Sequence, residues 1–228
     1  CLEIAKDYFG VALKSAESDP NGGATVVMSV NDMSSYMLKI DIQLEVLKAL
    51  TPMIPKLELL LKITNLAEYT LFGPPAQRST IAWLLLVYRL DLGLRVLTDT
   101  IKREEWPAVF TNAGIHAARH LPLPQASQLI DDIKAAGADS EWQDLVLKAE
   151  TEVMALEKKD LKTAEKFAKM ISHPKLRCVA LIDAGKLKSA YLEAVKLEDP
   201  LALIALILPR AEKDGDQSVV KLCTNFVT

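Results

Sequence analysis

Residues 174–200 read PKLRCVALIDAGKLKSAYLEAVKLEDP, and the helix-breaking residues in this stretch decide the predicted fold. Pro174 and Pro200 suit the first turn of a helix, because a proline has no backbone N–H group to donate there. Gly185 suits the left-handed conformation that commonly ends a helix. Apolar side chains between these residues recur every three or four positions, which is the period of an α-helix. The stretch therefore predicts an antiparallel pair of helices joined by a tight turn.

The same pattern extends along the chain, whereas the alternation typical of strands is almost absent. It predicts helices over 32–51, 55–69, 91–103, 107–120, 122–136, 140–158, 160–171, 174–184 and 186–197, with others starting near Ser79, Pro200 and Asp216. Short loops between such helices make consecutive helices antiparallel. We predict an all-α fold, an α-solenoid of stacked antiparallel helical hairpins, with a compact helical bundle as the alternative. The repeat is degenerate, because no tetratricopeptide or ankyrin signature stands at its offsets.

We expect a single helical-repeat domain over 1–228, containing one long loop near its start. Residues 17–31 include Ser-Asp-Pro-Asn-Gly-Gly, which is concentrated turn chemistry, so this segment is predicted to be a mobile loop. The first residue is Cys1, and it already stands in a helical apolar pattern with Leu2 and Ile4. We therefore expect the chain to be a fragment of a longer polypeptide.

Charge and hydropathy exclude some classes of partner. The 228 residues carry 27 Lys and Arg against 30 Asp and Glu, a net charge of −3, so no broad positive field favours nucleic acid. The longest apolar runs are 81–88 and 201–208, far short of the roughly 20 residues that span a bilayer. They predict buried helices, and we expect no transmembrane segment.

Catalytic and metal-binding patterns are weak in this sequence. His116 and His120 share a helix face, but Ala117 takes the place of the glutamate of a zinc protease, so we expect them to be structural. A hydrolase or transferase with a helical cleft that uses this pair is the alternative function. Cys178 stands in an apolar helix stripe and is predicted to be a buried, inert thiol. We therefore expect that the chain is not an enzyme and that it binds neither a metal ion nor a cofactor.

We expect the charged side chains of the predicted helices to lie on faces that are exposed to solvent. This expectation includes acidic residues such as Glu150 and Glu152. Lysines at 158, 162, 166 and 169 follow one another at intervals of three and four, so they share one helix face. An ordinary solvated face is favoured over contact with phosphoinositide or another acidic surface.

Three blocks of sequence resemble one known family. Lys175-Leu176-Arg177, followed by Gly185-Lys186-Leu187-Lys188-Ser189-Ala190-Tyr191-Leu192-Glu193-Ala194-Val195-Lys196, is similar to the C-terminal helical region of the spastizin family. Thr70-Leu71-Phe72-Gly73 and Asp41-Ile42-Gln43-Leu44-Glu45-Val46 resemble blocks upstream in that family. Little beyond helical character matches between 76 and 171.

The resemblance implies a C-terminal fragment of a large FYVE-finger protein of late endosomes and lysosomes. It implies a non-enzymatic protein-interaction scaffold for membrane traffic, protein transport and autophagy, cytoplasmic and peripheral on those membranes through the rest of the full-length protein. The implied partners are a spatacsin-like protein and the fifth adaptor-protein complex. Candidate partner-binding residues are Lys186, Lys188, Tyr191 and Lys196, although packing within the solenoid is the favoured role of Tyr191.

Overall fold

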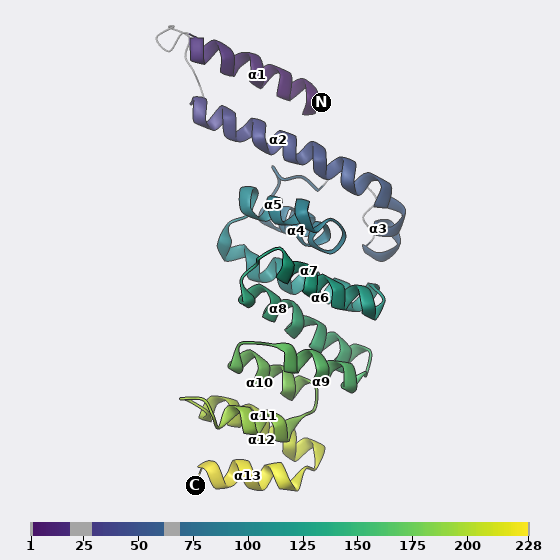
Figure 1. Cartoon of the computed structure of the whole chain (residues 1–228), viewed down its shortest axis with the longest axis vertical. Helices are drawn as coiled ribbons and strands as arrows, with labels where there is room; N and C mark the ends of the chain where they lie inside the picture. Colours follow the sequence, from purple (N-terminus) through teal and green to yellow (C-terminus); the bar gives the residue numbers. More distant parts are fainter. Residues whose placement is uncertain (1, 19–28, 62–68, 228) are drawn as a thin grey trace. The chain divides into compact units, whose positions relative to one another are not determined.

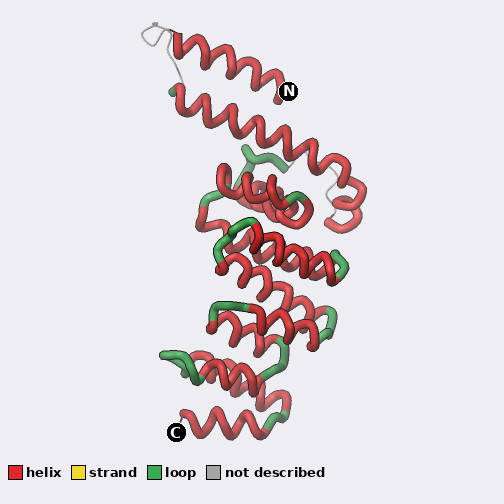
Figure 2. The backbone as a smooth tube through the Cα atoms, viewed as in Figure 1, coloured by secondary structure: helices red, strands yellow, loops and turns green. Residues whose placement is uncertain are grey.

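The computed structural model describes residues 2–18, 29–61 and 69–227, and no residue in these ranges lies in a strand (Figure 1, Figure 2). The prediction of an all-α chain is therefore confirmed. The chain divides into two compact units, unit 1 over Cys1–Trp106 and unit 2 over Pro107–Thr228. Whether both form the single domain that we expected stays a prediction.

Unit 1 is built from α1 to α5. These helices are α1 Leu2–Ser18, α2 Val30–Leu50, α3 Ile54–Leu61, α4 Pro75–Tyr88 and α5 Leu90–Thr100. Within the unit, α1 packs on α2 and α4 packs on α5. The run 81–86 of α4 is buried apart from Trp83, as the sequence predicted for this apolar run. Gly93 of α5 lies so close to α4 that an added Cβ would approach the Leu86 nitrogen to 2.6 Å.

The helix that follows the predicted loop begins earlier than its sequence pattern indicated. Ser29 caps α2, because its hydroxyl accepts a hydrogen bond from the Asp32 N–H at 3.1 Å. At the other edge of the predicted loop, α1 continues to Ser18. The rest of that loop, 19–28, lies outside the described residues, as do 62–68 of the helix predicted over 55–69.

Unit 2 contains the helices that the glycine and proline pattern predicted. They are α6 Trp106–His120, which starts at the boundary, α7 Leu123–Ala135, α8 Ser140–Glu152, α9 Leu161–Met170, α10 Pro174–Asp183, α11 Leu187–Ala194, α12 Leu201–Asp214 and α13 Gln217–Val227. Gly137, Gly185 and Gly215 follow α7, α10 and α12 with φ of 74°, 70° and 73°. These left-handed glycines end three helices as the sequence predicted.

The helices of unit 2 form a stack. From α7 onward each helix packs on the next, and α8, α10 and α12 also contact one another in turn, as in helical repeats. Figure 1 shows successive helices reversing direction down this stack. Unit 2 is therefore a solenoid of antiparallel hairpins rather than a compact bundle. None of the helices in the described ranges combines the length and the apolar character needed to cross a bilayer.

A glycine and two aromatic side chains set the distance between α6 and α8 in the core of unit 2. A Cβ at Gly114 of α6 would approach the Val146 carbonyl of α8 to 2.7 Å, so the two helices lie in close contact. The Phe110 and Trp142 rings stack between the same helices, with centroids 5.3 Å apart. Because α8 has neighbours on several sides, Glu150 is fully buried, and the prediction of a solvated face is wrong for this residue.

Candidate protein-interaction surface

The first part of helix α12, residues 201–209, is apolar on all sides but is buried on only one. The covered side of the helix consists of Leu203, Ile204, Ile207 and Ala211. The other side forms a surface that we name the α12 strip: Leu201, Ala202, Ala205, Leu206 and Pro209. The side chains of Leu201 and Leu206 are 55% and 54% exposed. The prediction that 201–208 is a buried helix is therefore wrong for half of its surface.

The neighbouring helices explain this one-sided burial. Helix α12 contacts α10, α11 and α13. Its buried residues recur at three and four along one face, and the strip residues do the same on the opposite face. The first part of the helix therefore presents an apolar face to solvent. An exposed apolar patch of this kind typically marks a site of contact with another molecule.

Helix α12 continues beyond an internal proline. Pro209 lies within the helix, on the exposed side, and the helix continues for a further turn. Arg210 forms an ion pair with Asp214 at 3.3 Å, and Gly215 ends the helix in the left-handed conformation. The strip therefore lies on one continuous helix.

Two of the four predicted partner-binding residues form ion pairs within the stack. Lys186, directly before α11, lies 2.8 Å from the Glu165 carboxylate of α9. Lys196 lies 3.1 Å from Glu193, which also pairs with Arg177 of α10 at 3.0 Å. These pairs connect α11 to its neighbours.

Lys188 is exposed and Tyr191 is half-buried. On the same helix, Leu187, Ala190 and Ala194 are buried, so α11 packs between its neighbours. A role in partner binding for these candidates stays a prediction.

The carboxyl groups of these pairs have lowered pKa values. Hydrogen bonds from Lys169 and Lys186 lower the pKa of the Glu165 carboxyl to about 2. Hydrogen bonds from Arg177 and Lys196 likewise lower the pKa of Glu193. Both carboxylates therefore remain ionised and keep holding their basic partners.

The histidine pair has the geometry of a packed helix end. The His116 and His120 rings have centroids 4.7 Å apart, and His116 is only 3% exposed. The third histidine, His173, lies before α10, where its Nδ1 accepts a hydrogen bond from the Leu176 N–H at 3.4 Å. No three His, Cys, Asp or Glu side chains in the described ranges form a group that could hold a metal ion.

Cys178 is buried in α10, as the sequence predicted. Its Sγ lies 3.3 Å from the Ala190 carbonyl oxygen. Burial, with a smaller contribution from the charge of Glu193, raises the pKa of the Cys178 thiol to about 11. The thiol is therefore protonated near neutral pH, and a protonated, buried thiol is a poor nucleophile.

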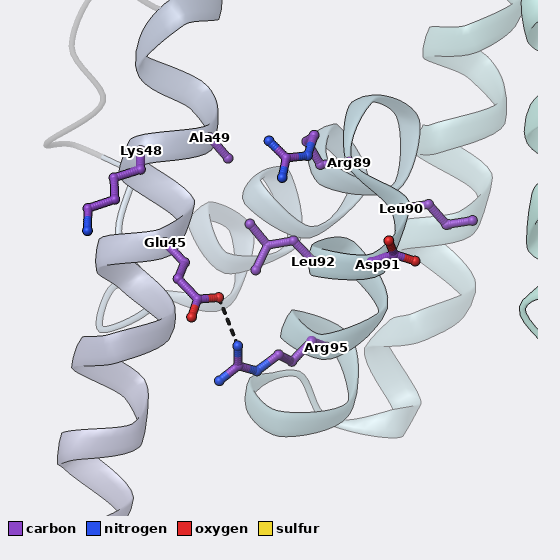
Figure 3. Close-up of a pocket in the computed structure, with 8 residues that line it drawn as sticks. All are labelled: Glu45, Lys48, Ala49, Arg89, Leu90, Asp91, Leu92 and Arg95. Atoms are coloured by element: carbon purple, nitrogen blue, oxygen red, sulfur yellow. Dashed lines mark hydrogen bonds and ion pairs between the residues drawn. The ribbon is translucent and has the colours of Figure 1, made fainter.

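A groove of about 500 Å³, lined by both charged and apolar side chains, lies within unit 1 between α2 and the α4–α5 hairpin (Figure 3). Arg95 of α5 reaches across it to Glu45 of α2 at 2.8 Å. Lys48, Arg89 and Asp91 also line the groove, so both signs of charge are present. We interpret the groove as a surface feature bridged by a structural ion pair.

Comparisons with known proteins agree with this repeat architecture. A family model described as "ZFYVE26-like, TPR repeats" matches residues 105–228, which cover the whole of unit 2. This match supports the spastizin-related helical region that the sequence blocks indicated. It also identifies tetratricopeptide-type repeats where we had found no signature.

A curated protein of Dictyostelium discoideum, Protein DDB_G0276689, is 26% identical to this chain over 233 residues. The alignment covers 99% of this chain but 8% of that relative, so the chain spans less than a tenth of its length. No solved structure matches. Because the family model covers more than half of the chain, the chain belongs to the ZFYVE26-like family with TPR repeats.

Proposed function

We propose that this chain is a non-enzymatic protein-interaction scaffold of late endosomal and lysosomal membrane traffic, with a spatacsin-like protein and the fifth adaptor-protein complex as its partners. The family supports a helical scaffold, because stacked repeats present long, rigid surfaces to other proteins. The resemblance of 175–177 and 185–196 to the spastizin family supports the partners and the cytoplasmic, membrane-peripheral location.

The α12 strip is the observation that carries this proposal. Leu201 and Leu206 lie on its first two turns, at the two edges of the strip, and Ala202 and Ala205 between them leave room for a close approach. An amphipathic helix of a partner recognises such a surface by laying its own apolar face along it. Covering the strip would remove two leucine side chains from water, which stabilises the complex.

A capture experiment tests the strip against a matched control. The double variant Leu201→Ser and Leu206→Ser removes its large apolar groups, and Leu59→Ser with Leu123→Ser makes the same change at exposed leucines of α3 and α7. We expect the parent chain and the control to capture the spatacsin-like protein and the adaptor complex from a cell lysate. The strip variant should lose both while melting at the parent temperature.

Equal capture by the strip variant and the parent would contradict the assignment of this surface. Failure of the parent chain to capture either protein would contradict the proposed partners.

A further inference from the structure

A second surface of unit 2, at the turn between α8 and α9, combines unpaired lysines with exposed leucines. The side chains of Leu156 and Leu161 are 45% and 48% exposed. Four exposed lysines lie beside them in the sequence. We name this surface the basic turn: Leu156, Lys158, Lys159, Leu161, Lys162 and Lys166.

The backbone holds the basic turn in place. Beyond α8 the chain forms a π-helical turn over Val153–Glu157, and Lys159 reverses the chain direction with φ of 58°. Asp160 then caps α9 by accepting a hydrogen bond from the Thr163 N–H at 3.0 Å. The opposite side of α9 is buried through Ala164, Phe167 and Ala168. The exposed side therefore has a fixed orientation relative to the stack.

Each carboxylate of this segment has its main partner outside the basic turn, with smaller contributions from Lys158 at Glu157 and from Lys162 at Asp160. Glu157 forms an ion pair with Arg119 of α6. Asp160 is occupied as the cap, and Glu165 pairs with Lys169 and Lys186. Within the ranges that the structure describes, the four lysines of the basic turn form no ion pair. The turn is therefore locally positive although the whole chain has a net charge of −3.

The chemistry of these side chains favours a lipid surface over a protein surface. The four basic residues of this surface are all lysines. A lysine ammonium group is a compact, strongly hydrated charge, and it lacks the planar guanidinium group with which arginine binds one carboxylate through two hydrogen bonds. Lysine is depleted in protein–protein interfaces. Clusters of four or more basic residues are typical of proteins that bind anionic lipid. Leucines beside such a cluster can enter the boundary between headgroups and acyl chains.

We propose that the basic turn binds the surface of an anionic lipid bilayer, with its ammonium groups on lipid phosphates or carboxylates and Leu156 and Leu161 inserted between headgroups. This contact goes beyond the protein scaffold proposed above. It also gives this chain a membrane contact of its own, which the family resemblance assigns to the rest of the protein. An acidic protein surface is the competing occupant.

Vesicle flotation of the 228-residue chain tests the proposal. Vesicles of phosphatidylcholine alone are compared with vesicles that contain about 30% phosphatidylserine, at low and at high salt. One variant changes Lys158, Lys159, Lys162 and Lys166 to Gln. The control variant makes the same change at four exposed lysines elsewhere: Lys102, Lys134, Lys213 and Lys221.

We expect the parent and the control to float only with the anionic vesicles, and less at high salt. The basic-turn variant should lose binding by about tenfold or more. A Leu156→Ser and Leu161→Ser variant, which keeps every charge, should bind more weakly than a Leu59→Ser and Leu123→Ser control. Melting curves that match the parent confirm that each variant is folded.

Equal losses in the basic-turn and control variants would overturn the proposal, because net charge alone would then explain the binding. Absence of parent flotation with anionic vesicles would also overturn it. If the parent ignores vesicles but binds polyglutamate through the four lysines, the surface belongs to an acidic protein.

Discussion

Glu150 of α8 is a carboxyl group in the core of unit 2. Its side chain is fully buried, and neither carboxylate oxygen has a hydrogen-bond partner among the described residues. Burial raises the pKa of this group to about 9, because an unpaired charge is poorly solvated there. Glu150 is therefore protonated near neutral pH in the folded state. A rise in pH lowers the free energy of unfolding, because the carboxyl ionises in the unfolded state before it ionises in the folded state.

The first prediction concerns the pH dependence that Glu150 adds. Between its unfolded pKa of 4.5 and its folded pKa of about 9 the native state binds one more proton than the unfolded state. Stability should therefore fall as pH rises through this window, by about 3 kcal/mol between pH 4.5 and pH 7. Urea unfolding of the parent and of Glu150→Gln at several pH values measures the difference. Identical slopes for the two proteins would show that Glu150 is ionised in the folded state.

Tyr191 gives the second prediction at this scale. Its ring is half-buried, whereas the neighbouring Leu192 points outward and is exposed. Truncating a fully buried aromatic costs about 3 to 5 kcal/mol, so Tyr191→Ala should cost less, about 1 to 3 kcal/mol.

Thermal unfolding compares this variant with Leu192→Ala, which should melt close to the parent. If Tyr191→Ala melts like the parent yet loses partner capture, Tyr191 is a recognition residue and its packing role is refuted.

At the scale of the element, helix ends were the most predictable feature. Gly185 with its positive φ, and Asp160 with its bond to Thr163, behave as their residue types require. The end of α8 was not predictable in the same way. The pattern over 140–158 predicted one α-helix, but the last turn widens to a π-helix and Lys159 adopts the left-handed conformation. No local residue preference favours a lysine there, so neighbouring packing decides it.

The third prediction follows from that conformation. Lys159→Gly should stabilise the chain by about 1 kcal/mol, because glycine adopts a positive φ without a steric penalty. The matched control is Lys158→Gly, at a residue with φ of −83°, where the change should destabilise by up to about 1 kcal/mol. Urea unfolding midpoints measure both. Destabilisation by both glycines would contradict the left-handed turn.

At the scale of the whole molecule, periodicity and helix-breaking residues were enough to predict an all-α chain and the solenoid of unit 2. They could not predict which helix faces meet. Glu150 and Leu206 illustrate this limit, because the polar residue is buried and the apolar one is exposed. Both outcomes depend on how many neighbours surround a helix, which is a tertiary property. The repeat class was also hidden, because the signature residues of tetratricopeptide repeats do not stand at their offsets in this sequence.

The most direct test of the scaffold proposal is site-specific photo-crosslinking in cells. A benzoylphenylalanine placed at Ala205, in the α12 strip, is compared with one at Gln128, an exposed residue of α7. We predict that the probe at Ala205 forms a crosslink to the spatacsin-like protein or to a subunit of the fifth adaptor-protein complex, and that the probe at Gln128 does not. Crosslinks to these proteins from Gln128 alone, or from neither position, would contradict the account.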